Sequence, residues 1–189
     1  MRIISGLNKG KKLIMPNDKK TRPLKDMAKE SIFNVLTHAN YINFHLKDSK
    51  VLDLFSGIGS FGLECISRGS KYVFFLENYP PVLEILKKNI TNLKYENKSN
   101  IIRIDAFEIN KNFFKIDQKF EIIFCDPPYK EKKIEVLIKN IIEMDILEKN
   151  GIIIIHRKKG DIDNYPKKFE IVDTKNYGLS TFVLGKKSN

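Results

Sequence analysis

The stretch from Lys50 to Glu64 holds the residues of this chain whose types and spacing carry the clearest chemical meaning. An apolar run, which we expect to form a buried strand, is followed by Gly57, Gly59 and Gly62 in the spacing G-x-G-x-x-G. Glycines at a strand-to-helix turn let the backbone bend sharply and let a ligand approach bare N–H groups. Glu77 ends the next apolar run, where a carboxylate can bind ribose hydroxyls. The pattern predicts a nucleotide-like pocket but does not define a reaction.

Asp53, inside the expected strand, favours one class of ligand for this pocket. A dinucleotide such as NAD would bring an anionic pyrophosphate to the glycine turn, where a nearby carboxylate repels it. S-adenosylmethionine instead carries a sulfonium cation and an ammonium group, and a carboxylate attracts both. We therefore expect this methyl donor in the pocket. The alternative is a structural role in which Asp53 caps the turn.

A second motif, D-P-P-Y at residues 126–129, suits methyl transfer to an exocyclic amine. Such a nitrogen is a poor nucleophile because its lone pair is delocalised into the ring. Asp126 and a carbonyl of Pro127 or Pro128 can accept its two N–H hydrogens, and they bind more strongly as positive charge develops. Tyr129 offers a face on which a flat base can stack. The alternative is a rigid strand-to-loop turn without chemistry.

The charge of the chain is concentrated at its N-terminal end. Residues 1–29 hold nine Lys or Arg and two acids, and so carry +7 of the formal net charge of +11. A basic front end on a nearly neutral body indicates contact with a polyanion. A solvated basic face without a partner is the alternative.

Composition narrows the class of protein further. The chain has 189 residues, of which 42% are hydrophobic, enough for one domain with a real core. No apolar run approaches the roughly 20 residues that span a membrane, and the N-terminus lacks the apolar segment of a secretory signal. Two cysteines, Cys65 and Cys125, do not form a disulfide scaffold, and three histidines lack the spacing of metal ligands. We expect a reduced, cytoplasmic protein without a metal, in which Cys125 is buried and not a nucleophile.

The elements that must position these motifs alternate between strand and helix from residue 50 onward. Strands are expected at 50–55, 72–77, 100–104, 121–125, 152–155, 169–175 and 180–186. Helices are expected at 26–39, 59–68, 80–93, 107–114 and 131–147. This order predicts an α/β fold with a doubly wound, mostly parallel seven-stranded sheet that ends in an antiparallel hairpin. Ligands of such sheets bind beyond the carboxyl ends of the strands, where four acids would meet: Asp53, Glu77, Asp105 and Asp126.

The motifs together resemble a known group of enzymes. D-L-F-S-G-I-G-S-F-G-L-E at residues 53–64, Glu77, Asp105-Ala106 and D-P-P-Y resemble the Rossmann-like, class I S-adenosylmethionine-dependent amino-methyltransferases. The front end carries R-I-I-S-G-L-N-K-G-K-K-L, T-R-P-L-K-D and K-E-S-I-F-N-V-L, and these segments resemble the bacterial 16S ribosomal RNA guanine-N2 methyltransferases of the RsmD type. This second resemblance covers nearly the whole chain.

The resemblance implies methyl transfer from S-adenosylmethionine to the N2 amine of a guanine in 16S rRNA, within a partly or fully assembled small ribosomal subunit. We expect a basic arm or hairpin and helix at 1–40 that contacts RNA, and a methyltransferase domain at 41–189, packed as a single unit. We expect a monomer, because one exposed target per event makes a monomer adequate. The remaining assignments are those that the resemblance implies. The cofactor would be bound by Asp53, Phe55, Gly57, Gly59, Glu77, Asp105 and Ala106. The target guanine would be held by Asp126, Pro127, Pro128 and Tyr129, and rRNA phosphates by Arg2, Lys9, Lys11, Lys12 and Arg22.

Three positions depart from the pattern of that family: Leu24 after Arg-Pro, Ile58 in the glycine turn, and His156 after the fifth strand, where an acid is common. Other functions share the same pocket chemistry. Methylation of adenine N6 in DNA or of a protein glutamine amide uses the same amine geometry, although the basic front end disfavours a protein substrate. A non-catalytic RNA-binding assembly factor would not need D-P-P-Y, and an NAD oxidoreductase would leave it without a role.

Overall fold

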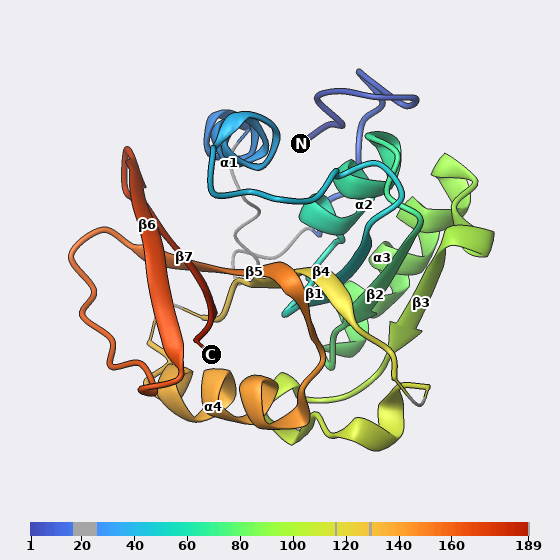
Figure 1. Ribbon diagram of the computed structural model, residues 1–189. Helices are drawn as coiled ribbons and strands as arrows, with labels where there is room; N and C mark the ends of the chain where they lie inside the picture. Colours follow the sequence, from blue (N-terminus) through green and yellow to red (C-terminus); the bar gives the residue numbers. More distant parts are fainter. Residues whose placement is uncertain (17–25, 116, 129, 189) are drawn as a thin grey trace.

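The computed structural model describes residues 1–16, 26–115, 117–128 and 130–188, and its centre is one seven-stranded sheet (Figure 1). The strands are β1 (Lys50–Leu54), β2 (Tyr72–Leu76), β3 (Ser99–Ile102), β4 (Phe120–Cys125), β5 (Leu147–Lys158), β6 (Phe169–Tyr177) and β7 (Ser180–Lys187). Their order across the sheet is β3-β2-β1-β4-β5-β7-β6. Strands β1 to β5 pair in parallel, whereas β7 is antiparallel to both β5 and β6. The predicted doubly wound sheet with its antiparallel hairpin is confirmed.

Helices cover both faces of the sheet (Figure 1). The helices are α1 (Asp26–His38), α2 (Ser60–Ser67), α3 (Pro80–Leu93) and α4 (Ile134–Met144), and three short 3-10 helices are η1 (Glu96–Lys98), η2 (Ala106–Glu108) and η3 (Lys111–Phe113). Helices α1, α2 and α3 share one apolar cluster with Val51 and Val73, and α4 shares another with Leu52 and Leu54. Alternation of side chains along β1 divides these neighbouring residues between the two faces. In the part of the chain that the structure describes, no helix is both long enough and apolar enough to cross a membrane.

The connection from α4 to β5 differs from the prediction. The helix was expected to reach residue 147 and the strand to begin at 152, but α4 ends at Met144 and β5 begins at Leu147. Asp145 stops the helix in the left-handed conformation, with a φ of 55°. Gly151 then lies near the irregular register of β4 and β5, where a Cβ would approach the Phe120 carbonyl oxygen to 2.9 Å. Apolar residues continue across this boundary, so helical spacing alone did not reveal it.

The irregular helix expected at 107–114 consists of two single 3-10 turns, η2 and η3. Asp105 accepts the Phe107 N–H at 3.0 Å and so caps η2, and Asn110 accepts the Asn112 N–H at 3.0 Å and caps η3. Short polar side chains that bond to nearby backbone compete with a continuous helix. The two caps therefore divide one expected helix into two turns.

Residues 1–16, here called the N-terminal arm, pack against α2 and α3. Ile3 and Leu13 are buried and belong to the apolar cluster that also contains α1 and α2. Asn8 donates its backbone N–H to Ser67 Oγ at 3.0 Å and its side-chain amide to the Leu93 carbonyl at 3.2 Å. The arm is thus attached by apolar burial and by polar contacts to the ends of two helices.

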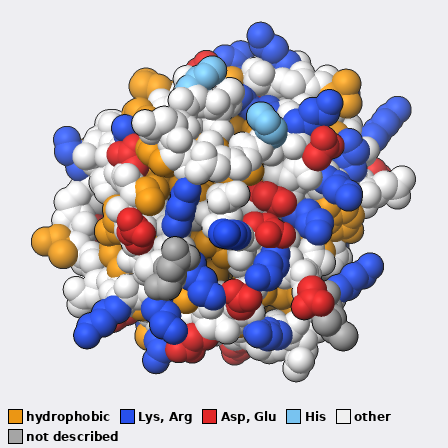
Figure 2. All heavy atoms as spheres, in the orientation of Figure 1, with side chains coloured by type: hydrophobic (Ala, Val, Ile, Leu, Met, Phe, Trp, Pro, Cys, Tyr) orange, Lys and Arg blue, Asp and Glu red, His pale blue; other side chains and the backbone are white. Residues whose placement is uncertain are grey.

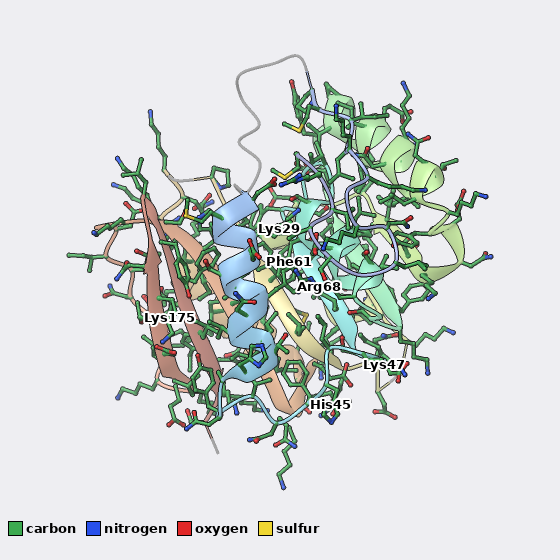
Figure 3. All side chains as sticks on the ribbon, turned by 90° about the horizontal axis from the view of Figure 1, so that it is seen from above. Lys29, His45, Lys47, Phe61, Arg68 and Lys175 are labelled. Atoms are coloured by element: carbon green, nitrogen blue, oxygen red, sulfur yellow. The ribbon has the colours of Figure 1, made fainter. Side chains whose placement is uncertain are left out.

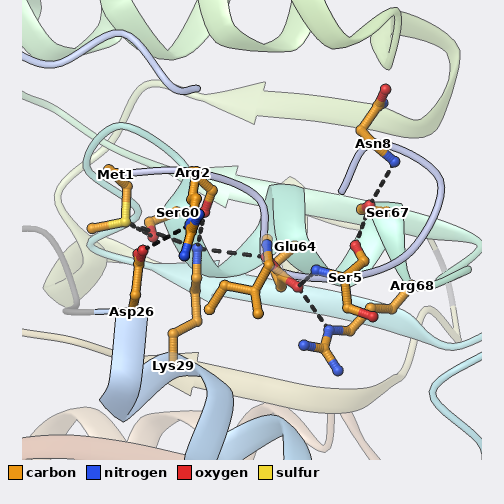
Figure 4. A network of polar contacts seen from close by, with 12 residues as sticks. Met1, Arg2, Ser5, Asn8, Asp26, Lys29, Ser60, Glu64, Ser67 and Arg68 are labelled. Atoms are coloured by element: carbon orange, nitrogen blue, oxygen red, sulfur yellow. Dashed lines mark hydrogen bonds and ion pairs between the residues drawn. The ribbon is translucent and has the colours of Figure 1, made fainter. Parts of the chain in front are cut away.

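The carboxylate of Glu64 on α2 binds the backbone of the N-terminal arm (Figure 4). It accepts the backbone N–H groups of Ile4 at 2.7 Å and Ser5 at 2.9 Å, and Arg68 Nε donates to it at 2.8 Å. Lys29 Nζ lies 3.5 Å from the same carboxylate, and both side chains are 0% exposed. In the view from above, α1 with Lys29 lies between the β6–β7 hairpin and α2, which carries Phe61 (Figure 3). One buried carboxylate therefore joins the arm, α1 and α2.

Candidate active site

The register of the parallel strands brings their carboxyl ends level. Leu54 lies opposite both Leu76 and Cys125. Leu76 in turn lies opposite Ile102, and Cys125 lies opposite Ile155. The residues directly after these positions form one rim, and they include Phe55, Glu77, Asp126 and His156. Asp53, one position before Leu54, lies just below the same rim.

The three glycines of the turn are needed for two different reasons. Gly57 and Gly59 have φ values of 55° and 84°, in the left-handed region that favours glycine, and Gly59 is the N-cap of α2. Gly62 lies inside α2, where an added Cβ would be 2.3 Å from Cε1 of Phe75 on β2. The first two glycines therefore make the turn, and the third lets α2 pack closely on the sheet.

Glu77 fastens the glycine turn to the end of β2. Its Oε2 accepts the Gly57 N–H at 2.8 Å, and its Oε1 accepts the N–H groups of Asn78 at 3.0 Å and Tyr79 at 2.9 Å. The side chain is only half-buried, so the carboxylate lies at the surface of the rim. Its expected role in binding ribose stays a prediction, for which this position at the mouth of the turn is suitable.

Asp53 lies beneath the turn and is 1% exposed. Its Oδ2 accepts the Gly62 N–H at 3.0 Å, which satisfies one of the free donors at the start of α2. Burial raises the pKa of Asp53 well above its usual value, and the charges of Asp126 and Glu77 raise it further against the opposing effect of the Gly62 N–H. Asp53 therefore caps the start of α2. Because its side chain is buried, its predicted attraction for a cationic ligand would be an electrostatic effect without direct contact.

An aromatic pair lies beside the next two predicted cofactor residues, Asp105 and Ala106. Phe55 and Phe107 have ring centroids 5.5 Å apart, and Ala106 is buried in the apolar cluster to which both rings belong. Phe55 has a φ of 57°, which is rare for a large side chain, and strained backbone of this kind clusters at functional sites. Phe107 was not predicted, although an aromatic residue two positions after a rim acid was the available signal.

Asp126 is fixed by a residue that sequence reasoning did not use. His156 Nδ1 lies 2.8 Å from Asp126 Oδ1, and the backbone N–H of Asp126 donates to the Leu54 carbonyl at 3.4 Å. Among the residues that the structure describes, none donates a hydrogen bond to Asp126 Oδ2. The side chain of Asp126 is 23% exposed. One oxygen is thus held in place while the other can accept from a ligand. Thirty positions separate the two residues, so only the pairing of β4 with β5 reveals the contact.

The two prolines after Asp126 have different surroundings. Pro127 is buried, whereas Pro128 is exposed and its carbonyl accepts the Glu131 N–H at 2.8 Å. The expectation that either prolyl carbonyl could accept from a target amine therefore narrows to Pro127, because the Pro128 carbonyl already closes the following turn. Tyr129, predicted to stack on the base, lies outside the described residues.

Cys125, directly before Asp126, is fully buried. Burial raises the pKa of its thiol, and the nearby Asp126 carboxylate acts in the same direction. A thiol that resists ionisation is a poor nucleophile, which agrees with the expectation for this residue. Within the described ranges, no group of three or more His, Cys, Asp or Glu side chains is arranged to hold a metal ion.

Four of the five predicted RNA-binding residues lie on the N-terminal arm, and all four are exposed: Arg2, Lys9, Lys11 and Lys12. Arg2 forms an isolated antiparallel bridge with Lys12 and an exposed ion pair with Asp26 at 3.4 Å. Lys and Arg side chains project over much of the face shown in Figure 2, including its upper edge. Arg22, the fifth predicted residue, and Leu24 lie outside the described residues.

The parallel sheet, the glycine turn and the acidic rim define the class of Rossmann-like methyltransferases. The chain matches the family model described as "Conserved hypothetical protein 95" over residues 1–186, and it belongs to that family. It is 32% identical over 188 residues to ribosomal RNA small subunit methyltransferase D of Haemophilus influenzae, covering 97% of this chain and 92% of the relative. The Escherichia coli protein of the same name is 31% identical over 154 residues, covering 80% of this chain and 68% of the relative. The predicted resemblance to the RsmD family is confirmed.

Solved structures agree with this placement. A structure from Haemophilus influenzae superposes with a TM-score of 0.77 at 30% identity and covers 100% of this chain and 98% of that chain. The protein yhhF from Escherichia coli gives a TM-score of 0.81 at 24% identity, covering 100% of this chain and 98% of that chain. The second likeness shows the fold alone.

The family implies S-adenosylmethionine as the methyl donor, and the residues of the rim fit it. Gly57 offers half-buried backbone without a Cβ at the turn, and Glu77 places a half-buried carboxylate beside it. Glu77 and Asp126 follow neighbouring strand ends at the rim, and their negative charge favours a sulfonium and an ammonium group. A pyrophosphate would meet the same charges unfavourably. The donor set therefore fits the methyl donor better than a dinucleotide.

Proposed function

We propose that this chain transfers a methyl group from S-adenosylmethionine to the exocyclic N2 amine of a guanine in 16S rRNA. Three features support the proposal: its relatives named ribosomal RNA small subunit methyltransferase D, the exposed cations of its N-terminal arm, and the held carboxylate of Asp126. The geometry of Asp126 is the observation that carries it. A carboxylate with one fixed oxygen and one oxygen without a donor among the described residues is suited to accept a hydrogen from a bound amine.

In this mechanism Asp126 Oδ2 and the Pro127 carbonyl accept the two N–H hydrogens of the guanine amine. Together they orient the nitrogen lone pair, and orientation of this kind contributes much of the rate gain in transfer reactions. Both acceptors bind more strongly as positive charge develops on the nitrogen, so they stabilise the transition state more than the ground state. No strong base is required, because the proton can leave after the transfer. Stacking of the base on Tyr129 completes the proposal.

S-adenosylmethionine supplies an electrophilic methyl group when it is bound. Gly57 and Gly59 would accept its methionine portion, with the field of Asp53 behind them, and Glu77 would bind the ribose hydroxyls. Asp105 and Ala106 would contact the adenine edge, beside the Phe55–Phe107 pair. Ile58 is one of the positions that differ from the family pattern. It is buried and belongs to the apolar cluster that contains residues of α3, so its side chain packs in the core.

The arm residues Arg2, Lys9, Lys11 and Lys12, with Arg22, would contact rRNA phosphates. Such contacts position the RNA without reading its sequence, and they make binding depend on salt. We further propose that the protein is a cytoplasmic monomer, and that its substrate is the rRNA of a partly or fully assembled small subunit.

The experiment is methyl transfer onto small subunits that lack the modification, followed by identification of the product nucleoside. We expect N2-methylguanosine at one position with the wild-type chain, and loss of transfer in Asp126→Ala. Glu143→Gln, at an exposed position of α4, is the matched control and should keep full activity. N6-methyladenine made preferentially on duplex DNA would contradict the proposed substrate. Failure to bind S-adenosylmethionine by calorimetry would instead favour the non-catalytic assembly factor.

A further inference from the structure

Asp126, His156 and Ser180 form one chain of hydrogen bonds across the rim. His156 Nδ1 lies 2.8 Å from Asp126 Oδ1, and His156 Nε2 lies 2.8 Å from Ser180 Oγ. His156 is 4% exposed, whereas Asp126 and Ser180 are only partly buried. The histidine is therefore a buried link between a carboxylate of the candidate site and a hydroxyl at the start of β7.

The imidazole ring has one fixed orientation. It stacks on the ring of Phe182 with centroids 4.8 Å apart and an interplanar angle of 18°. His156 and Phe182 are direct partners in the β5–β7 ladder, and Ser180 pairs with Lys158 in the same ladder. A ring that is stacked on one face and contacted at both nitrogens has little freedom to rotate. The antiparallel hairpin thus acts as a support for the histidine.

The next residue, Arg157, contacts Glu131, five positions after Asp126. Arg157 Nη2 donates to the Glu131 carbonyl at 3.0 Å, and its Nε donates to Asp163 at 2.8 Å. Consecutive residues of a strand point to opposite faces of the sheet. Neighbouring side chains of β5 therefore contact Asp126 and Glu131 from their two faces of the strand.

We propose that His156 is a positioning residue for methyl transfer, a role that rests on the function proposed above. By donating from Nδ1 to Oδ1, it directs Asp126 Oδ2 toward the target amine. Ser180 has the complementary task. When its hydroxyl donates to Nε2, the ring proton stays on Nδ1, and a neutral donor leaves the negative charge of the carboxylate available to the substrate.

Kinetics of two substitutions separate positioning from packing. His156→Phe keeps a ring that can stack on Phe182 but removes the N–H group, whereas His156→Asn places an amide N–H close to the position of Nδ1. We expect His156→Phe to lower kcat by roughly tenfold to a hundredfold, with KM for the small subunit and Kd for S-adenosylmethionine within about twofold of wild type. His156→Asn should recover most of the lost kcat. A wild-type kcat in His156→Phe, or no recovery in His156→Asn, overturns the proposal.

Nitrogen-15 NMR of the histidine ring tests the same idea without any methyl transfer. We expect the wild-type spectrum to show the His156 proton on Nδ1, and Ser180→Ala to shift the tautomer population toward Nε2. A proton found on Nε2 in the wild-type protein, or spectra unchanged by Ser180→Ala, would contradict the assigned role. An inactive wild-type chain whose histidine shows the expected tautomer would count against the proposed function, while the contact to Asp126 would be supported.

Discussion

Two carboxylates of this molecule have opposite surroundings. Glu64 is 0% exposed and receives two backbone N–H groups, the Arg68 guanidinium and the Lys29 ammonium. Asp126 lies at the rim, is 23% exposed in its side chain and, within the described ranges, is contacted by the side chain of His156. Both are held, but only one has an oxygen with no donor among the described residues.

This difference distinguishes a carboxylate that stabilises the fold from one that can take part in catalysis. A charge taken out of water is tolerated only when partners replace its hydration, and at Glu64 the partners do so completely. Lys29 also donates to the Arg2 carbonyl at 2.7 Å, so the buried pair serves to attach the N-terminal arm. At Asp126 the partner fixes a direction and leaves acceptor capacity for a ligand. We therefore expect changes at Glu64 to alter stability and changes at Asp126 to alter rate.

The largest effect is expected at Glu64. Glu64→Gln leaves the Lys29 charge buried without its counter-ion and turns an amide N–H toward the donors of the arm. Removing one partner of a buried ion pair typically costs about 3–5 kcal/mol, and we expect a loss of that size in the free energy of unfolding. Denaturant unfolding measures it, with Glu30→Gln on the exposed face of α1 as the control. A loss below about 1 kcal/mol would show that the arm does not depend on this cluster.

The next effect is on rate. Asp126→Asn retains the shape of the side chain but removes its charge, and we expect kcat to fall by about a hundredfold to a thousandfold, the range seen when one transition-state hydrogen bond is removed. The free energy of unfolding should change by less than about 1 kcal/mol, because the side chain is partly exposed. Single-turnover methyl transfer and denaturant unfolding of the same variant provide both values. Large destabilisation with an unchanged rate would reverse the comparison.

Asp53 sharpens the comparison, since it is buried like Glu64 yet has no cationic partner among the described residues. Its pKa is raised chiefly by burial, so the folded state binds its proton more tightly than the unfolded state does. The contribution of Asp53 to stability should therefore increase as the pH falls through the folded-state pKa toward the lower unfolded-state value, and it should be lowest at higher pH, where Asp53 is ionised in both states. Asp53→Asn keeps an acceptor for the Gly62 N–H, and we expect it to stabilise the ligand-free protein at neutral pH by on the order of 1 kcal/mol.

Thermal unfolding of both proteins between about pH 5 and about pH 8 checks the sign for Asp53. The wild-type protein should gain stability relative to Asp53→Asn as the pH is lowered. Calorimetry with S-adenosylmethionine on the same samples tests the predicted attraction, which requires weaker binding by Asp53→Asn. Equal affinities would leave Asp53 as a structural cap alone.

The smallest effect is expected at Asp145, a charged residue in solvent. Hydrogen bonds from Lys187 and Lys119 lower the pKa of its carboxyl to about 2, but its side chain is 47% exposed. An acid with a lowered pKa contributes stability above its unfolded value, and this contribution is lost as the pH falls toward 2. Solvent screens such pairs, so we expect Asp145→Asn to cost less than about 1 kcal/mol, and less still in high salt. Asn tolerates the left-handed backbone at this position, which isolates the charge.

Much of the fold could be predicted because its signals are local. Mostly apolar segments between turn residues indicated β1, β2 and β4, and Pro80 and Pro81 indicated the start of α3. Spacing does not mark a boundary where apolar residues continue from one element into the next, as from α4 into β5. The glycine turn and the D-P-P-Y motif could also be identified from the sequence, because the residues of each lie close together in the chain.

The sequence alone determined the class of sheet, the position of the glycine turn, the rim of acids and the family, since these follow from short-range spacing and from strand ends that must meet. Only the tertiary structure decided what each carboxylate touches. It showed that Asp53 caps a helix, that Glu64 fastens the arm, and that His156 and Ser180 stand behind Asp126. The physical reason is that hydrogen-bond partners depend on which strands lie side by side, and the spacing of residues along the chain does not specify that order.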